Sequence, residues 1–132
     1  MKKPKRILII KQPWATMIVR GIKPVENRTW WSAYRGRLYI HASKTWDREG
    51  AKWIVSRHPE RTDFLRFLYH SRYLQGYIIG HVNMIDCVQE HPSEWFVGPY
   101  GFVFENPHEY WRELAVPCKG HLGIWKYEGE VP

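Results

Sequence analysis

Charged side chains and aromatic rings crowd into residues 21–31 of this chain, in a pattern that suits the binding of a polar ligand. Lys23, Glu26 and Arg28 bring charges of both signs, and two tryptophans follow directly. Lysine and arginine donate to phosphate oxygens, arginine with two parallel bonds. A glutamate accepts from the exocyclic amine of a base such as cytosine, and an aromatic ring stacks on the base. These residue types indicate a site for a planar, anionic ligand.

The same segment has two other interpretations. Lys23 and Glu26 could serve as an acid–base pair in catalysis, with His41 as a third member. Alternatively, Glu26 and Arg28 form an ion pair that only stabilises the fold. The sequence alone leaves these interpretations open.

Further candidates lie downstream, where polar and aromatic residues could extend the site. His41 to Lys44 lie at the end of a predicted strand, and the turn 98–101 carries Tyr100, which is either a surface turn residue or a residue at the rim of a cleft. The predicted nucleic-acid-binding residues are therefore Lys23, Glu26, Arg28, Trp30, His41, Ser43, Lys44, Trp46 and Tyr100.

Composition bounds the class of protein. The 132 residues fit a single domain, 1–132, and 44% apolar residues are enough for a buried core. The net charge of +7 favours an anionic partner, with nucleic acid as the first candidate. Lys2, Lys3, Lys5 and Arg6 are expected to form a solvated basic terminus.

Cysteine and histidine usage predicts a protein without metal or cofactor. The two cysteines form no CxxC pair, and the seven histidines lack metal-ligand spacing. No apolar run is long enough for a membrane span or a signal segment. A reduced, cytoplasmic protein without membrane attachment is expected.

Periodicity predicts more strands than helices. The strand at 25–30 has a period of two, which places Glu26, Arg28 and Trp30 on one face. Gly80 predicts a bulge or a close backbone approach in the longest strand. The other predicted strands are 6–10, 37–42, 77–88, 101–105 (ended by Asn106-Pro107) and 120–127.

Helices are predicted between the first strand and the long middle strand. One begins near Pro13 and ends at Gly21. The second has Thr45 as its N-cap and runs to about Arg57. The third spans 60–73, and its predicted buried residues are Phe64, Leu65, Phe67 and Leu68. The predicted fold class is α+β, a small mixed β-barrel or strongly curved sheet with flanking helices.

Several segments resemble the ASCH domain family. Gly21-Ile22-Lys23-Pro24-Val25-Glu26-Asn27-Arg28 fits the family signature Gly-x-Lys-x-x-Glu-x-Arg. Other similar segments follow in family order, at 11–15 (KQPWA), 41–44 (HASK), 76–80 (GYIIG) and 119–125 (KGHLGIW).

The resemblance implies a PUA-like β-barrel with flanking helices, a cleft beside the signature and a role in RNA metabolism. The leading hypothesis is a domain that binds RNA or a nucleotide. The alternative is a small hydrolase, either a ribonuclease or an enzyme similar to the N4-acetylcytidine amidohydrolases of the family. Those relatives carry a threonine nucleophile where this chain has Glu26, which argues against the same mechanism here. A third hypothesis is a protein-interaction domain with a structural ion pair at the signature.

Overall fold

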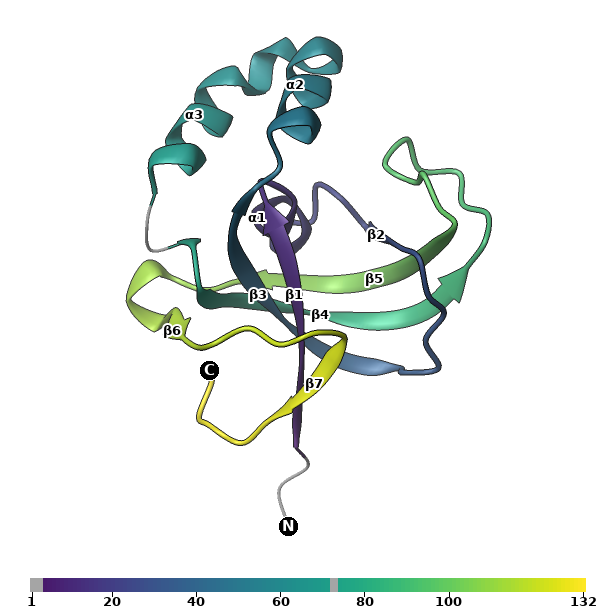
Figure 1. Ribbon diagram of the computed structural model, residues 1–132, viewed down its shortest axis with the longest axis vertical. Helices are drawn as coiled ribbons and strands as arrows, with labels where there is room; N and C mark the ends of the chain where they lie inside the picture. Colours follow the sequence, from purple (N-terminus) through teal and green to yellow (C-terminus); the bar gives the residue numbers. More distant parts are fainter. Residues whose placement is uncertain (1–3, 72–73) are drawn as a thin grey trace.

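The computed structural model describes residues 4–71 and 74–132, which form a mixed α+β fold around one curved sheet (Figure 1). The main hydrogen-bonded path of the sheet runs β2-β5-β4-β3-β1-β7, with β6 paired to β4. The strand bounds are β1 Lys5–Gln12, β2 Val25–Arg28, β3 Gly36–Trp46, β4 Tyr77–Val88, β5 Tyr100–Glu109, β6 Val116–Pro117 and β7 Ile124–Tyr127.

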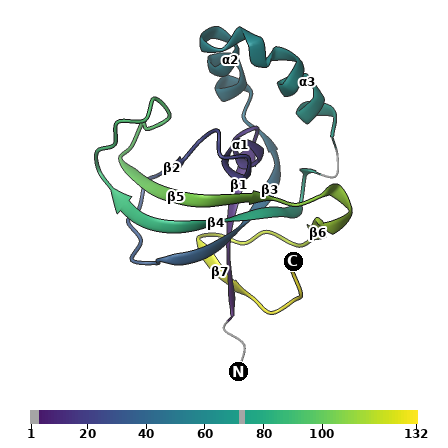
Figure 2. The ribbon, with the colours of Figure 1, turned by 180° about the vertical axis from the view of Figure 1, so that it is seen from behind.

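The helices occupy two places relative to this sheet. The short helix α1 contacts β1, β3, β4 and β5, whereas α2 and α3 lie together at one end of the molecule (Figures 1 and 2). Their bounds are α1 Trp14–Val19, α2 Arg48–Arg57 and α3 Thr62–His70, with 3-10 turns η1 Pro59–Arg61 and η3 Arg112–Leu114.

The main core lies between α1 and the inner face of the sheet. β1 pairs with β3 in parallel, and Leu8 and Ile40 are fully buried partners at the centre of this pair. Val19 of α1 and Phe102 of β5 pack into the same cluster. Burial of such side chains contributes about 1.5–3 kcal/mol each, so this region fixes the strands that carry the candidate site.

The α+β class and the flanking helices are confirmed, and closure of the sheet into a barrel is not. Among the described residues, β2 and β7 are the two ends of the hydrogen-bonded path and do not pair with each other. The sheet is nevertheless strongly curved (Figure 2).

The prediction for Gly80 is confirmed. A Cβ atom at this position would lie 2.1 Å from the carbonyl oxygen of His108, so any side chain would collide with backbone. The pairing of β3 with β4 also shifts register beside this glycine, between Ile40 and His41. Glycine therefore permits both the bulge and the close approach of β5.

The predicted start of the second helix is wrong by two residues. β3 continues through Thr45 to Trp46, and Asp47 is the N-cap of α2. The Asp47 carboxylate accepts the Gly50 N–H at 2.9 Å. Aspartate caps a helix at least as well as threonine, which frees Thr45 for the strand.

The predicted end of the fifth strand at Asn106-Pro107 is also wrong. β5 continues to Glu109 through a register shift, in which Asn106 adopts a positive φ of 51°. Proline is tolerated in a strand at such a bulge. The last strand is shorter than predicted and begins at Ile124, just after Gly123 with its positive φ of 70°.

The third helix is α3 preceded by η1, and Phe67 is not part of its buried face. Leu65 and Leu68 are buried as predicted, Phe64 is half-buried, and Phe67 is 54% exposed. The predicted extension of this helix to Tyr73 lies outside the described residues. The same holds for Lys2 and Lys3 of the expected basic terminus.

Lys5 and Arg6 belong to β1 and are half-buried, so this part of the expected terminus is a strand. Within residues 4–71 and 74–132, no helix is both long and apolar enough to cross a lipid bilayer.

Candidate functional site

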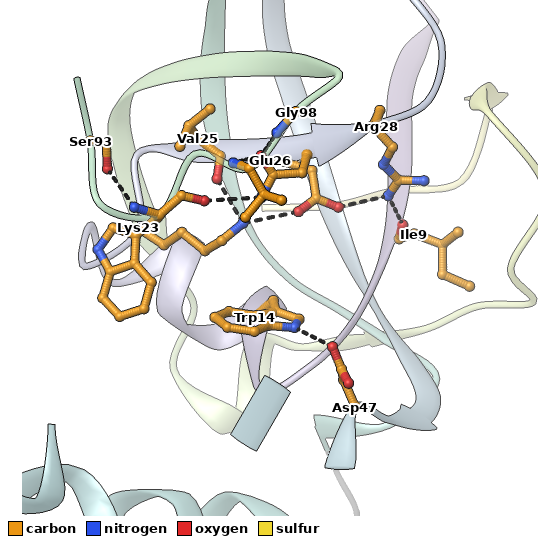
Figure 3. A network of polar contacts seen from close by, with 12 residues as sticks. Ile9, Trp14, Lys23, Val25, Glu26, Arg28, Asp47, Ser93 and Gly98 are labelled. Carbon is orange, nitrogen blue, oxygen red and sulfur yellow. Dashed lines mark hydrogen bonds and ion pairs between the residues drawn. The ribbon is translucent and has the colours of Figure 1, made fainter. Parts of the chain in front are cut away.

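A cleft of about 630 Å³ opens where β1, α1, β2 and the loop before β5 meet. Its floor carries the charged side chains of the 21–28 segment (Figure 3). The lining residues are Ile9, Ile10, Lys11, Trp14, Lys23, Glu26, Asn27, Arg28, Thr29, Trp30, Ser43, Asp47, Val97 and Gly98.

Lys23, Glu26 and Arg28 form one ion-paired triad at the floor of this cleft. The Lys23 ammonium lies 3.1 Å from Glu26 Oε1, and the Arg28 guanidinium lies 3.1 Å from Glu26 Oε2. Their side chains are only 4%, 11% and 20% exposed, respectively. Charges this far from solvent require partners. The triad therefore satisfies one carboxylate with two cations and leaves one net positive charge.

The end of α1 positions Lys23. Gly21 adopts a positive φ of 78° just after the helix, which ends α1 with a tight reversal. The backbone N–H groups of Ile22 and Lys23 then both donate to the Met17 carbonyl, at 2.9 and 3.2 Å. The Lys23 ammonium also donates to the Val25 carbonyl at 2.7 Å and lies 5.2 Å from the Trp14 ring centroid. Lys23 is thus held in one orientation.

Arg28 links the triad to β1. Its Nη2 donates to the Ile9 carbonyl at the wall of the cleft. Its Nε is buried and has no hydrogen-bond partner among the described residues. A buried donor without a partner is unfavourable by about 1–3 kcal/mol, so this guanidinium retains capacity for a further acceptor.

Asn27 points away from the triad and fixes the opposite wall. Its side-chain amide donates to the Trp95 carbonyl at 3.0 Å, and its Oδ1 accepts from the N–H groups of Val97 and Gly98 at 2.8 and 3.1 Å. These three bonds attach the loop 95–98 to β2 (Figure 3). The signature strand therefore places charges on one face and a loop clamp on the other, as its period of two predicts.

Trp14 and Asp47 are among the cleft residues that the sequence-based site did not include. Trp14 lies in the wall, and its indole N–H donates to Asp47 Oδ2 at 2.8 Å. The same carboxylate caps α2 through Oδ1. Trp14 has the spacing of a core residue on α1, and Asp47 is one of several acidic residues near the start of a helix. Only the tertiary contact between α1 and α2 brings them together.

The predicted site residues divide among four places: the cleft, a neighbouring pocket, a groove between α2 and α3, and the β2–β5 ladder. Trp30 lies in the cleft with the triad, edge-to-face on the core residue Phe102, with ring centroids 5.0 Å apart. Ser43 lines both the cleft and a neighbouring pocket, and that pocket also contains His41 and Lys44.

Trp46 and Tyr100 lie apart from the cleft. Trp46 lines a groove between α2 and α3 and packs edge-to-face on Tyr69. Tyr100 is paired with Arg28 in the β2–β5 ladder and packs against the main core.

His41 is buried in the wall of the neighbouring pocket. Its Nε2 lies 2.6 Å from the Cys118 carbonyl oxygen, so this nitrogen carries the proton. Burial lowers the pKa of His41, and the carbonyl partner offsets only part of this effect. The ring is therefore neutral near pH 7.

The geometry of the cleft suits binding of an anion beside an aromatic wall. Both oxygens of Glu26 are already paired with cations, so the carboxylate is held in place. Lys11 on the rim is exposed, and Arg28 has a donor without a partner. Within the described ranges, no group of three or more potential ligand side chains is arranged to hold a metal ion.

Comparison with known proteins identifies relatives over nearly the whole chain. The family model described as the ASCH domain matches residues 8–121. Human activating signal cointegrator 1 is 34% identical over 135 aligned positions, which cover 94% of this chain and 22% of that protein. The mouse protein of the same name is 33% identical over the same shares. The chain thus spans about a fifth of the length of these relatives.

Proposed function

Because this chain belongs to the ASCH domain family, we propose that it binds RNA and holds one nucleotide of a single strand in the cleft. The observation that carries the proposal is the ion-paired triad at the floor of a cleft of about 630 Å³. A volume of 300–1,000 Å³ is typical for sites that enclose a small molecule or one part of a larger ligand.

Charge supports an anionic ligand. Lys11, Lys23 and Arg28 line the cleft, against the carboxylates of Glu26 and Asp47. The Asp47 carboxylate caps α2 and accepts the indole N–H of Trp14, and both oxygens of the Glu26 carboxylate are ion-paired. The cations that remain for a ligand are Arg28 and Lys11. Phosphate contacts of this kind dominate the affinity for nucleic acid.

Aromatic walls support a base as the planar part of the ligand. Trp14 and Trp30 both line the cleft and are half-buried, so each ring has an accessible portion. Stacking of a base on an aromatic ring contributes about 1–3 kcal/mol and tolerates any base. We assign stacking to Trp30, because the Lys23 ammonium already lies over the Trp14 ring, 5.2 Å from its centroid.

Roles within the triad follow from exposure. Arg28, whose side chain is 20% exposed, is the more accessible cation of the triad, so we assign the phosphate contact to it. Lys23 is 4% exposed and acts mainly by fixing Glu26. Glu26 then presents its remaining lone pairs to a donor on the base or sugar.

Binding to a fluorescent single-stranded RNA of twelve nucleotides, measured by anisotropy at several salt concentrations, tests the proposal. The two phosphate contacts of the cleft, from Arg28 and Lys11, predict a contribution of about −1.4 to the slope of the logarithm of the binding constant against the logarithm of the salt concentration. Lys11→Gln removes one rim cation without touching the triad, so we expect several-fold weaker binding and a slope less steep by about 0.7.

Lys52→Gln is the matched control, since Lys52 is an exposed lysine of α2 outside the cleft. It should change affinity by less than twofold. Absence of RNA binding, or equal losses for the two lysine variants, would contradict the proposal.

The hydrolase alternative has one observation in its favour. The Lys23 ammonium and the Glu26 carboxylate are in direct contact at the floor of an open cleft, as an acid–base pair requires. Incubation with labelled RNA and with N4-acetylcytidine tests it. Turnover that is lost in both Lys23→Ala and Glu26→Gln, while these variants remain folded, would support catalysis. Turnover that survives both changes would exclude this pair as the catalyst.

A further inference from the structure

A second pocket of about 680 Å³ adjoins the cleft. Ile9 and Ser43 line both hollows, so the two are continuous across the end of β3. The remaining lining residues of the second pocket are His41, Lys44, Gln75, Gly76, Tyr77, Pro117, Cys118, Lys119 and Gly120.

Backbone hydrogen bonds build the walls of this pocket. Gly76 donates to the Ala42 carbonyl at 2.6 Å and accepts from the Cys118 N–H at 3.1 Å. His41 holds the Cys118 carbonyl from the other side, at 2.6 Å. Three segments that are distant in sequence are thus joined around the hollow. The pocket is preformed, which reduces the entropic cost of binding a ligand.

Glycines keep the pocket open. Gly76 has a positive φ of 84°, and a Cβ atom there would lie 3.0 Å from Lys44 Cε. A Cβ atom at Gly120 would lie 2.6 Å from the Ile9 side chain and 3.3 Å from the His41 ring. Side chains at these two positions would displace Lys44 and narrow the hollow between Ile9 and His41.

The charges of this pocket are all positive. Lys44 and Lys119 are exposed, and neither forms an ion pair within the described part of the chain. The lining includes no aspartate or glutamate. Two lysines without a carboxylate partner, on the rim of a preformed hollow, favour an anion.

His41 places a buried polar group in the lining of this pocket. Its side chain lines the pocket and is only 2% exposed, and its Nδ1 has no hydrogen-bond partner among the described residues. With the proton on Nε2, this nitrogen is an acceptor. A buried acceptor without a partner is unusual in native proteins.

We propose that this pocket binds the nucleotide adjacent to the one in the cleft, with Lys44 and Lys119 contacting the phosphate of that nucleotide. The inference rests on the proposed RNA-binding function and extends it. The ligand is a single-stranded segment of at least two nucleotides, whose backbone passes Ile9 and Ser43. A lone nucleotide would occupy only the cleft.

Two probes separate this subsite from the cleft. The first is a mixture of the four ribonucleoside 5′-monophosphates, and the second is a single-stranded RNA hexamer of mixed sequence. Each competes with the labelled twelve-nucleotide RNA in the anisotropy assay. The variant is Lys44→Gln with Lys119→Gln, and its control is Lys52→Gln with Lys126→Gln, which removes the same charge from exposed positions elsewhere.

We expect the pocket variant to bind the hexamer about tenfold more weakly. The slope of the logarithm of its binding constant against the logarithm of the salt concentration should be less steep by about 1.4, which corresponds to two phosphate contacts. Its affinity for the monophosphates should stay within twofold of the wild type. The control variant should lose less than twofold in affinity for either probe.

Other outcomes distinguish the two proposals. Equal losses for the pocket variant and the control would overturn the subsite, because net charge alone would then explain them. A tenfold loss for the monophosphates would also overturn it and would indicate a site for a free nucleotide or phosphate. If Lys11→Gln weakens hexamer binding while the pocket variant does not, the cleft proposal stands and the subsite falls. If the wild type binds neither probe, both proposals fall.

Discussion

The floor of the cleft and the rim of the second pocket are both basic, but they hold their charges in different ways. In the cleft, Lys23 and Arg28 are mostly buried and share one carboxylate, Glu26. At the pocket, Lys44 and Lys119 are exposed and have no ion pair within the described residues. The two regions meet at Ser43.

This difference separates stability from affinity. Buried charges that satisfy one another fix the shape of a site, and loss of one member leaves the others uncompensated. Exposed lysines contribute little to folding but remain available to a ligand. Substitutions at the floor should therefore act first on the free energy of unfolding, and substitutions at the rim should act first on binding.

The largest effect is expected for Glu26→Gln, which leaves Lys23 and Arg28 without a counter-charge. We expect the free energy of unfolding to fall by about 3 kcal/mol, measured by urea denaturation. Glu109→Gln is the control, because Glu109 pairs with Arg20 at the surface, where both side chains are about one third exposed. Its loss should stay below about 1 kcal/mol. Similar losses for both variants would contradict the larger contribution of the buried triad to stability than of a surface ion pair.

Asn27→Ala should have the next largest effect. It removes three hydrogen bonds between β2 and the loop 95–98, so we expect a loss of about 2 kcal/mol in the free energy of unfolding. Proteolysis should become faster within the loop and not at the second pocket. Asn83→Ala serves as a control for the loss of a strand asparagine, because Asn83 is half-buried in the middle of β4, where it pairs with Arg37 and Glu105. Unchanged loop cleavage in Asn27→Ala would contradict the assigned clamp.

A smaller effect is expected from pH at the wall of the pocket. Burial lowers the pKa of His41 in the folded state, whereas the unfolded chain titrates near 6.5. The contribution of neutral His41 to the free energy of unfolding is therefore complete above about pH 6.5. It falls as the pH drops from there toward the lowered pKa of His41 in the folded state. His41→Gln, which does not titrate, should lose less stability between pH 7 and 5 than the wild type.

The control for this pH effect is His70→Gln, because His70 is exposed at the end of α3 and is not one of the groups that lower the pKa of His41. Its pH profile should match that of the wild type in urea denaturation. His81 remains in every variant, and burial together with Arg37 and His108 lowers its pKa to about 4. His81 therefore adds the same pH dependence to the free energy of unfolding of every variant. The effect of His41 is read from the difference between the profiles of the variant and the wild type.

The smallest effect on stability is expected for Lys44→Gln with Lys119→Gln. The free energy of unfolding should change by about 0.5 kcal/mol or less, as is usual for surface substitutions. Lys44 and Lys119 would then act on binding and not on stability, since the same variant is expected to weaken RNA binding about tenfold. A loss above about 2 kcal/mol would show that these lysines are structural.

The alternation of the signature strand could be predicted from sequence because a strand has a fixed period of two. It places Glu26 and Arg28 on one face and Asn27 on the other, and the structure confirms this arrangement. β2 ends at Arg28, so the predicted continuation of the strand to Trp30 is wrong. Gly80 was equally informative, since only glycine allows the backbone of His108 to approach so closely. Local geometry determines both features.

Features that depend on tertiary contacts were not predicted. The capping role of Asp47 was missed because Thr45 is also a good N-cap in isolation, and β3 continues past it. Phe67 was assigned to the buried face of α3, which is amphipathic but packs through Leu65 and Leu68. Trp14 becomes part of the cleft only because α1 and α2 meet at Asp47.

The distribution of the candidate residues between the cleft and the second pocket could not be predicted from the sequence either. His41 and Lys44 are close to Ser43 along the chain, but the strand turns them toward a second pocket. The walls of that pocket include Cys118 and Lys119, which are more than seventy residues away. Contacts of this range follow from the pairing order of the strands, and no local pattern fixes that order.

Central to this account is contact between RNA and the floor of the cleft, and nitrogen-15 NMR of the side chains measures it most directly. On titration with the twelve-nucleotide RNA, the Nε–H signal of Arg28 and the indole N–H signals of Trp14 and Trp30 should shift. They should saturate at the dissociation constant that anisotropy gives. Unchanged signals from these three residues, with shifts confined to the groove between α2 and α3, would contradict the account.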